Sequence, residues 1–362
     1  MLETIKTIIL FIILMTVLIS VHELGHLIAA KIFNVYCGEY SIGMGPKIYS
    51  HQFKETNFSI RALPIGGFVS MAGDEENGLE TKTDTTNIPF ERTLNGVAKW
   101  KKIIIMYAGI FMNFVLAILI YSGILLYNGS YAKDTKPIIS SVVENYPAYN
   151  AGLQEGDIIT HIEFDNGASM SPKTYSELSI FALSYYEDGA WHLKVLRDGE
   201  TLDYDIDPIL EDNRYVIGIT FSNTYVNYVD INIFNCLIYG FEYALMIVRI
   251  TVNSLITLLK GVKLDSLSGP IGIYTTVKTA NDYGLLYYLQ LIAMISINVA
   301  AFNTLPLPVL DGGRAFLLLI EIIIGRPISK KTEEIIMQIS VALILMLFVY
   351  VSFNDIGRLI GG

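Results

Sequence analysis

The chain has 362 residues, of which 52% are hydrophobic and only 17% are charged, a balance that excludes an ordinary soluble enzyme. The net charge of −10 is concentrated in residues 131–230, which hold 17 acidic and 6 basic residues, and this excess argues against nucleic acid as a partner. Uncharged apolar runs at residues 7–21, 103–127, 284–310 and 335–353 predict an integral membrane protein.

The first predicted helix covers Met1–Phe33. Its apolar run becomes long enough to cross a bilayer once the stretch HELGHLIAA is included. A cleaved signal peptide is the alternative, but the segment begins with Glu3 and Lys6 rather than a basic cluster, and its apolar core runs long. Cleavage would also remove the strongest motif of the chain, so we predict a membrane span.

That motif is HELGH, which places His22, Glu23 and His26 inside an apolar run. An acid at the centre of a bilayer costs on the order of 3 kcal/mol on insertion scales, so such residues need a reason to be there. Residues four apart share a helix face, so both imidazoles can bind one zinc ion while the glutamate acts as a general base toward water. The alternative is a chance match among polar residues packed inside a bundle. Because ionisable residues within membrane spans are usually functional, we favour the metal site.

Residues 34–93 are mixed in polarity and rich in glycine. Strand-like pieces at 57–63 (NFSIRAL) and 66–71 (GGFVSM) indicate hairpins. The basic stretch Lys99–Lys102 (KWKK) then precedes the second apolar run, and basic residues in short loops mark the cytoplasmic side. The second helix is therefore predicted to enter the membrane from the cytoplasm.

Residues 128–223 form a soluble block of alternating apolar and polar residues. Asp198-Gly199 between two such runs predicts a tight hairpin, and a helix is expected near 174–186. About 95 residues suit one small α/β or mostly β domain. The segment Ile231–Leu259 that follows is apolar but carries two charges, so it either spans the membrane or lies along its surface.

A catalytic zinc takes three protein ligands, so the two histidines leave a site incomplete. The best remaining candidate is Asp311 in NTLPLPVLDGGRAF (Asn303–Phe316), where Pro306 and Pro308 break the third long apolar run. Broken backbone at membrane depth is tolerated where it lines a cavity or is buried in protein. Taken alone, Asp-Gly-Gly indicates a turn at a helix end. The first motif, together with the asparagine and proline context, favours a ligand.

The two motifs together resemble the site-2 protease family of intramembrane zinc metalloproteases, in its bacterial, RseP-like branch with a single PDZ domain. Further matches follow in family order over nearly the whole chain: YSIGMGPKIYS (Tyr40–Ser50), LPIGGFVSMAGDE (Leu63–Glu75), MNF (Met112–Phe114), NAGLQEGDIITHI (Asn150–Ile162) and LSGPIGI (Leu267–Ile273). The segment before Asn113 reads AGIFMNF, where the family often has a proline after the glycine. Many relatives carry two PDZ domains, and the soluble block here has room for one.

The resemblance implies a set of roles. Zinc is bound by His22, His26 and Asp311, and Glu23 activates the water that attacks a peptide bond within a substrate's transmembrane segment. Single-span membrane proteins, such as anti-sigma factors and remnant signal peptides, are the implied substrates.

The resemblance also implies a substrate-binding surface. Asn303 and Asn113 bind substrate backbone, and an edge strand formed by Gly66, Gly67, Phe68 and Val69 pairs with the unwound substrate. The alternative for this stretch is a surface loop that covers the bundle.

The ligand requirement predicts the topology. Zinc ligands meet at about 2 Å from one ion, so the first and third long helices must run in the same direction with one crossing between them. Ile231–Leu259 is then an interfacial or re-entrant amphipathic segment, and both termini lie outside. KWKK and RPISKK (Arg326–Lys331) face the cytoplasm, in agreement with the positive-inside rule. Cys37 and Cys236 fall on opposite sides, so no disulfide is expected.

The predicted fold class is therefore a polytopic α-helical protein of the bacterial cell membrane with about four transmembrane helices. Its predicted parts are helices 1 and 2 with a cytoplasmic-side, membrane-associated β-hairpin region (1–127), an extracytoplasmic PDZ-like α/β domain (128–223), an interfacial segment (224–280), and helices 3 and 4 (281–362). The active site is expected in the cytoplasmic half of the bilayer, with the PDZ-like domain as a size filter above it.

Two other classes of function compete with the protease. A noncatalytic membrane scaffold could use its PDZ-like domain alone, but a purely structural metal site needs no base such as Glu23. A metal transporter predicts polar residues through several spans, and the second and fourth predicted helices show few.

Overall fold

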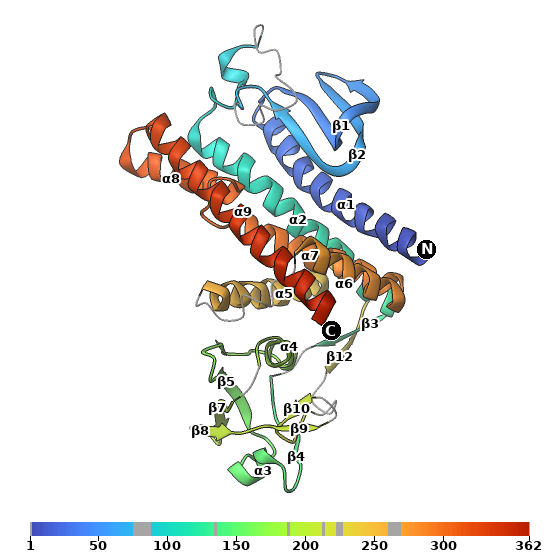
Figure 1. Ribbon diagram of the computed structural model, residues 1–362, viewed down its shortest axis with the longest axis vertical. Helices are drawn as coiled ribbons and strands as arrows, with labels where there is room; N and C mark the ends of the chain where they lie inside the picture. The colour runs from blue at the N-terminus through green and yellow to red at the C-terminus, as the bar shows by residue number, and fades with distance from the viewer. Residues whose placement is uncertain are drawn as a thin grey trace. The chain divides into compact units, whose positions relative to one another are not determined.

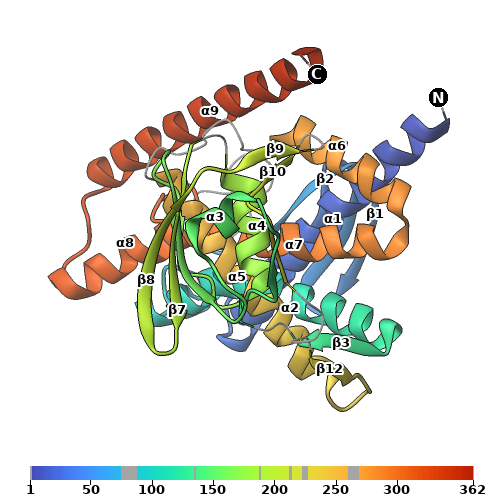
Figure 2. The same ribbon diagram turned by 90° about the horizontal axis from the view of Figure 1, so that it is seen from below.

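The computed structural model describes residues 2–74, 88–133, 136–186, 189–211, 214–221, 227–259 and 269–361. Of the motifs above, Glu75, Leu267 and Ser268 lie outside this set. The chain divides into two compact units, drawn in Figure 1 and Figure 2. We call Met1–Tyr121 with Ser268–Gly362 the helical unit, and Ser122–Leu267 the α/β unit.

The helical unit is built from long apolar helices. They are α1 (Leu2–Ile32), α2 (Lys99–Asn128), α6 (Pro270–Tyr283), α7 (Leu285–Asn303), α8 (Asp311–Ile324) and α9 (Lys330–Gly361), with a short 3-10 turn η1 (Phe90–Arg92) before α2. In both views α1 and α7 run in the same direction and α2 runs in the opposite one (Figures 1 and 2), the arrangement that the ligand argument required. The last turns of α2 belong to the α/β unit.

Five helices of the described chain are long and apolar enough to cross a membrane: α1, α2, α5 (Cys236–Leu259), α7 and α9. The outward faces of these helices carry exposed isoleucine, leucine and phenylalanine side chains, which suits contact with lipid. The protein is thus a polytopic membrane protein that also contains β-sheet. The expected number of four spans leaves α5 out and stays a prediction.

The chain between α7 and α8 is broken, as its prolines predict. Helix α7 ends at Asn303, and Asp311 is the first residue of α8, a separate helix that the sequence did not reveal. A Cβ atom on Gly312 would lie 2.5 Å from the Asn303 carbonyl oxygen, and one on Gly313 would lie 2.0 Å from the Leu307 carbonyl oxygen. Only glycines allow α8 to start this close to the preceding loop.

The region expected to hold hairpins forms two long, bent strands, β1 (Cys37–Phe53) and β2 (Thr56–Met71). The first half of β1 lies between the two ends of β2, because Tyr40 pairs with both Phe58 and Val69. The GGFVSM stretch is therefore the end of β2 rather than a hairpin of its own. Within the described residues β1 is its only strand partner, which leaves it at an edge of the sheet.

The α/β unit contains a four-stranded antiparallel sheet in the order β6-β5-β7-β8, with helix α4 packed against it. Its elements are β3 (Ser130–Lys133), β4 (Ser141–Val142), α3 (Pro147–Ala151), β5 (Ile158–Phe164), β6 (Ser169–Met170), α4 (Tyr175–Tyr185), β7 (Trp191–Arg197), β8 (Glu200–Ile206), β9 (Ile209–Glu211), β10 (Arg214–Val216), β11 (Ile219–Thr220), β12 (Asn227–Asp230) and α5. Asp198 and Gly199 both have positive φ, so the predicted tight hairpin is present.

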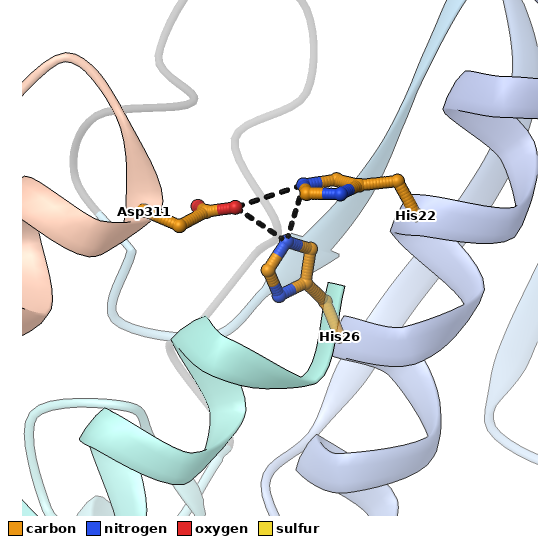
Figure 3. A group of neighbouring side chains, drawn as sticks. All are labelled: His22, His26 and Asp311. Atoms are coloured by element: carbon orange, nitrogen blue, oxygen red, sulfur yellow. Dashed lines mark hydrogen bonds and ion pairs between the residues drawn. The ribbon is translucent and has the colours of Figure 1, made fainter. Parts of the chain in front are cut away.

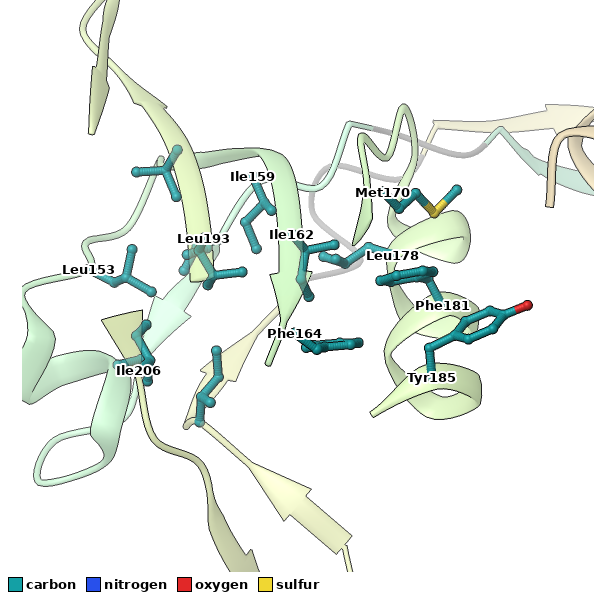
Figure 4. Packing of buried hydrophobic residues seen from close by; sticks show 14 of the residues in the cluster. Leu153, Ile159, Ile162, Phe164, Met170, Leu178, Phe181, Tyr185, Leu193 and Ile206 are labelled. Atoms are coloured by element: carbon teal, nitrogen blue, oxygen red, sulfur yellow. The ribbon is translucent and has the colours of Figure 1, made fainter. Parts of the chain in front are cut away.

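The core of this unit follows from the alternation in its strands. Inward residues of β5 and β7 meet the apolar face of α4, where Phe164 stacks on Phe181 with ring centroids 5.4 Å apart (Figure 4). Thr174 caps α4 by accepting a hydrogen bond from the Glu177 backbone N–H. The sequence therefore builds a domain with its own core between α2 and α5.

Helix α5 packs on α4 within the same unit. Arg249 of α5 forms an ion pair with Glu177 of α4 at 3.3 Å, and the Glu177 side chain is almost completely buried. At its other end, α5 crosses the last turns of α2, where a Cβ atom on Gly240 would lie 2.1 Å from the Ser122 hydroxyl oxygen. Cys37 and Cys236 are both buried free thiols.

Candidate metal centre

Helix α1 carries the first two residues of the site on one face. The Nε2 atoms of His22 and His26 lie 3.2 Å apart, and both approach Oδ2 of Asp311, at 2.8 and 3.3 Å respectively (Figure 3). The three side chains are buried or nearly so, and they are the only group of this kind in the described part of the chain. The broken backbone after α7 brings a residue 289 positions away in sequence to His22.

The donor set fits zinc. Two imidazole nitrogens and one carboxylate oxygen are the ligands of many catalytic zinc sites, which leave a fourth position open. Ligand atoms about 2.0–2.1 Å from a tetrahedral zinc ion lie roughly 3.3 Å from one another. The three separations here, 2.8, 3.2 and 3.3 Å, are close to that edge length, so small movements would admit the ion.

Helix α2 lies directly against the two histidine rings. The Nδ1 atom of His26 is 2.8 Å from the Ile105 carbonyl oxygen, and the Nδ1 atom of His22 is 3.4 Å from the Asn113 side-chain nitrogen. Between them, a Cβ atom on Gly109 would lie 2.6 Å from Nε2 of His26 and 2.8 Å from Nε2 of His22. Because Gly109 has no side chain, the two imidazole rings can occupy this space.

A second glycine allows the two helices to approach. A Cβ atom on Gly25 of α1 would lie 2.2 Å from the Ala108 carbonyl oxygen of α2. The sequence reasoning missed Gly25, Gly109 and the Ile105 carbonyl. Two glycines within apolar helices at matching depth were the available signal, because small residues permit close helix crossings in membranes.

Glu23 lies beside the three-residue cluster and faces the sheet. Its Oε2 accepts a hydrogen bond of 3.1 Å from the Val69 backbone N–H, at the edge end of β2. A Cβ atom on Gly67 would lie 3.9 Å from Cγ of Glu23. The outer edge of this strand therefore faces the carboxylate that the sequence proposed as the base.

The other predicted substrate-binding residues differ in their surroundings. The Asn303 backbone packs on Gly312, next to Asp311, and its side chain is half-buried. Asn113 is fully buried against His22. The ring of Phe68 lies 4.9 Å from the Arg61 guanidinium, and Gly66 packs on the Met44 side chain, so these two lie farther along the strand.

The chain is similar to known proteins over nearly all of its length. The model of peptidase family M50 matches residues 10–347 of the chain. The regulator of sigma-W protease RasP of Bacillus subtilis is 29% identical, with 98% of this chain and 99% of that protein covered. The zinc metalloprotease RasP of Bacillus licheniformis is 29% identical over the same shares, and a Clostridium perfringens relative is 32% identical over 94% of this chain and 95% of its own length.

The two histidines lie on the continuous helix α1, and the aspartate follows the break after α7. A membrane protein with this donor set among apolar helices has the features of a metal-dependent hydrolase. Because the family model matches most of its length, the chain belongs to peptidase family M50. It is a zinc metalloprotease.

Proposed function

We propose that this protein cleaves peptide bonds within the transmembrane segments of single-span membrane proteins, with anti-sigma factors and remnant signal peptides as its substrates. The observation that carries the proposal is the meeting of His22, His26 and Asp311 among apolar helices, with Glu23 one residue away. Relatives named for RasP, one of them as regulator of sigma-W protease, support the substrate class.

In the proposed mechanism the three clustered side chains hold zinc and Glu23 handles protons. Zinc, when bound, supplies Lewis acidity that polarises the peptide carbonyl and acidifies a water molecule. Glu23 takes a proton from that water as the oxygen–carbon bond forms. It then gives the proton to the departing amine as the carbon–nitrogen bond breaks. One carboxylate thus accepts the proton and later donates it.

Substrate is proposed to bind as an added strand at the outer edge of Gly66–Met71. A transmembrane helix hides its peptide carbonyls in internal hydrogen bonds, so cleavage requires local unwinding, and an edge strand satisfies the groups released. The contact between the Val69 N–H and Glu23 supports this placement, because a strand paired there lies directly beside the base. Asn303, next to the backbone of Gly312, is proposed to bind the substrate backbone on the other side.

Residues 128–223 are proposed to be a single PDZ-like domain outside the cell. The glycine-containing stretch PAYNAGLQEGDIITHI spans α3, where Gly152 ends the helix with positive φ, and runs into β5. The pairing of β4 with the later β11 closes the domain on itself. Its proposed role is to exclude substrates whose outer domains have not yet been trimmed.

Two contacts support the proposed orientation. Lys99 at the start of α2 forms an ion pair of 2.9 Å with Glu321 near the end of α8, which puts the KWKK stretch and the nearby Arg326–Lys331 on one side. Positive residues mark that side as cytoplasmic. The second contact is the ion pair between Arg249 of α5 and Glu177 of α4.

Helix α5 is proposed to lie along the outer membrane surface. Arg249 lies nine residues beyond Gly240, about 14 Å along the helix, yet it still pairs with Glu177 in the soluble domain. A crossing α5 would draw α4 and its domain into the hydrocarbon. Its exposed large apolar residues Leu237, Ile238, Phe241, Leu245, Val252 and Ile256 fall within about 100° of the helix circumference, a stripe suited to an interface.

Exchanging the proposed base tests the catalytic assignment. We expect Glu23→Gln to lower cleavage of a model transmembrane substrate by roughly 10²–10⁴-fold while zinc content stays unchanged, because the ligands remain. Glu3→Gln, an exposed change on the same helix, is the control. Wild-type cleavage by purified Glu23→Gln protein would refute the mechanism, whereas absence of cleavage by any form would favour the scaffold.

Cysteine labelling tests the orientation. With Cys37 and Cys236 replaced by serine, Thr201→Cys should react with an impermeant thiol reagent in intact cells, and Ser329→Cys only after the membrane is opened. Both positions are exposed, so reactivity reports sidedness. Labelling of both from outside would mean that α5 crosses the membrane.

A further inference from the structure

The two histidines of the metal centre are held by one face of α2. Ile105, Gly109 and Asn113 follow one another at spacings of four residues, so they share a face. Because α1 and α2 run in opposite directions, His26 meets the earlier position and His22 the later one, with Gly109 between them. Helix α2 therefore borders Nδ1 of each ring, the nitrogen that faces away from the other histidine.

The hydrogen bond made by one nitrogen of an imidazole ring decides whether the other nitrogen can bind a metal. A neutral imidazole carries one proton, so a ring that binds through Nε2 has its proton on Nδ1 and needs a hydrogen-bond acceptor there. For His26 the acceptor is the Ile105 carbonyl oxygen at 2.8 Å. His22 has no such carbonyl in the described structure, and its neighbour is the Asn113 amide.

The amide of Asn113 meets this need in only one of its two orientations. Its nitrogen faces Nδ1 of His22 at 3.4 Å, while Oδ1 is buried and has no hydrogen-bond donor among the described residues. An amide nitrogen and a protonated Nδ1 are both donors and cannot bond. Rotating the amide by 180° exchanges the two atoms with almost no change of shape, and it places the carbonyl oxygen against the Nδ1 proton.

Asn113 is firmly placed for such a role. It is fully buried, and its backbone carbonyl accepts a hydrogen bond of 2.8 Å from the Ser296 hydroxyl of α7, which is also fully buried. The residue is thus held between α1, α2 and α7 with no exposed surface.

We infer that Asn113 is a positioning residue that accepts a hydrogen bond from Nδ1 of His22 and thereby presents Nε2 to the zinc. This replaces the substrate-binding role that the family resemblance implied for it. The inference rests on the proposed ligand role of His22. Partners of this kind, which hold a metal-binding histidine from behind, typically change metal affinity by roughly 10- to 100-fold when removed.

Two substitutions at the same position test the inference by zinc affinity, measured in competition with a chelator on detergent-purified protein. Asn113→Leu has a similar volume and no acceptor, so we expect affinity to fall roughly 10- to 100-fold. Asn113→Asp keeps an acceptor and should remain within a few-fold of wild type, since its charge also offsets the net positive charge of zinc with one carboxylate. The leucine variant is scored only if it stays monodisperse.

A matched control separates hydrogen bonding from packing. Ser296→Ala removes the bond to the backbone of Asn113, whose position is still set by helix α2, and leaves the amide, so its zinc affinity should stay near wild type. The inference is overturned if Asn113→Asp binds zinc as weakly as a leucine or His22→Ala variant, or if Asn113→Leu binds as tightly as wild type. Retention of zinc by His22→Ala would instead refute the ligand assignment, so the two failures are distinguishable.

Discussion

Among the described residues, histidine and aspartate meet at two places, once in each unit. In the helical unit His22 and His26 share one oxygen of Asp311 in buried surroundings. In the α/β unit His192 lies between Asp165 and Asp205 on the sheet surface, with Nε2 2.8 Å from one carboxylate and Nδ1 2.6 Å from the other. The residue types match, but the two arrangements suit different chemistry.

The difference lies in the nitrogen that faces away from the centre. Both ring nitrogens of His192 face carboxylates, and hydrogen bonds to Asp205 and Asp165 raise the pKa of the imidazole, which favours a positively charged ring without a lone pair for a metal. In the helical unit the Nδ1 atoms of both histidines face α2, so both Nε2 atoms converge on one point. What lies behind a histidine thus separates a candidate metal centre from a surface ion pair.

Removing one aspartate from each cluster gives the largest expected contrast. We expect Asp311→Ala to lose nearly all bound zinc and all cleavage, because two histidines alone leave the site incomplete. Asp165→Ala should keep wild-type zinc content, since His192 then loses a partner but gains no second ligand. Elemental analysis of detergent-purified protein measures both. Normal zinc in Asp311→Ala would remove this residue from the ligand set and undo the contrast.

A methyl group placed against the Nε2 atoms of the two histidines gives the next largest effect. Gly109→Ala puts a Cβ atom 2.6 Å from Nε2 of His26, so we expect the rings to move and zinc affinity and cleavage to fall at least 10-fold. Gly123→Ala is the control on the same helix, because its Cβ atom meets nothing within 4 Å. Exchanging glycine for alanine in a helix is otherwise favourable by about 1 kcal/mol. Equal activity in the two variants would show that the α1–α2 crossing is loose.

The smallest expected effect is the pH response of the surface cluster. Because the pKa of His192 is raised on folding, its stabilising contribution is fully present below its ordinary value of 6.5 and is lost as pH rises through the folded value. The Tm of the full chain should therefore exceed that of His192→Gln in acid, with the gap closing in alkali. Solvent and salt screen these exposed groups, so the gap should be small and shrink further at high ionic strength. A gap that widens with pH would reverse the proposed charge state.

The sequence predicted which residues form the three-residue cluster better than it predicted what lies behind them. HELGH on a helix and Asp311 after a proline-broken run could be found from spacing and composition, and the structure brings them together. The acceptors behind the rings could not, because they depend on which face of α2 meets α1. The Ile105 carbonyl has no side-chain signature at all.

The fold shows the same division. The long apolar helices, the Asp198-Gly199 hairpin and helix α4 follow from local pattern. The double pairing of β1 with both ends of β2 and the ion pair between Glu177 and Arg249 depend on contacts distant in sequence, so no local pattern reports them. Helix α8 was hidden because its apolar residues follow Asp311 and two glycines that suggest only a turn.

The wide sequence separation within the centre has a consequence for biosynthesis. Asp311 enters the membrane 289 residues after His22, when most of the chain has already been made. With the proposed ligand set, a ribosome-bound chain carries two histidines without the aspartate that completes them, and we expect it not to cleave the translocating proteins around it. We therefore expect the protease to become competent only once α8 has been made, and a chain truncated before α8 to be inactive.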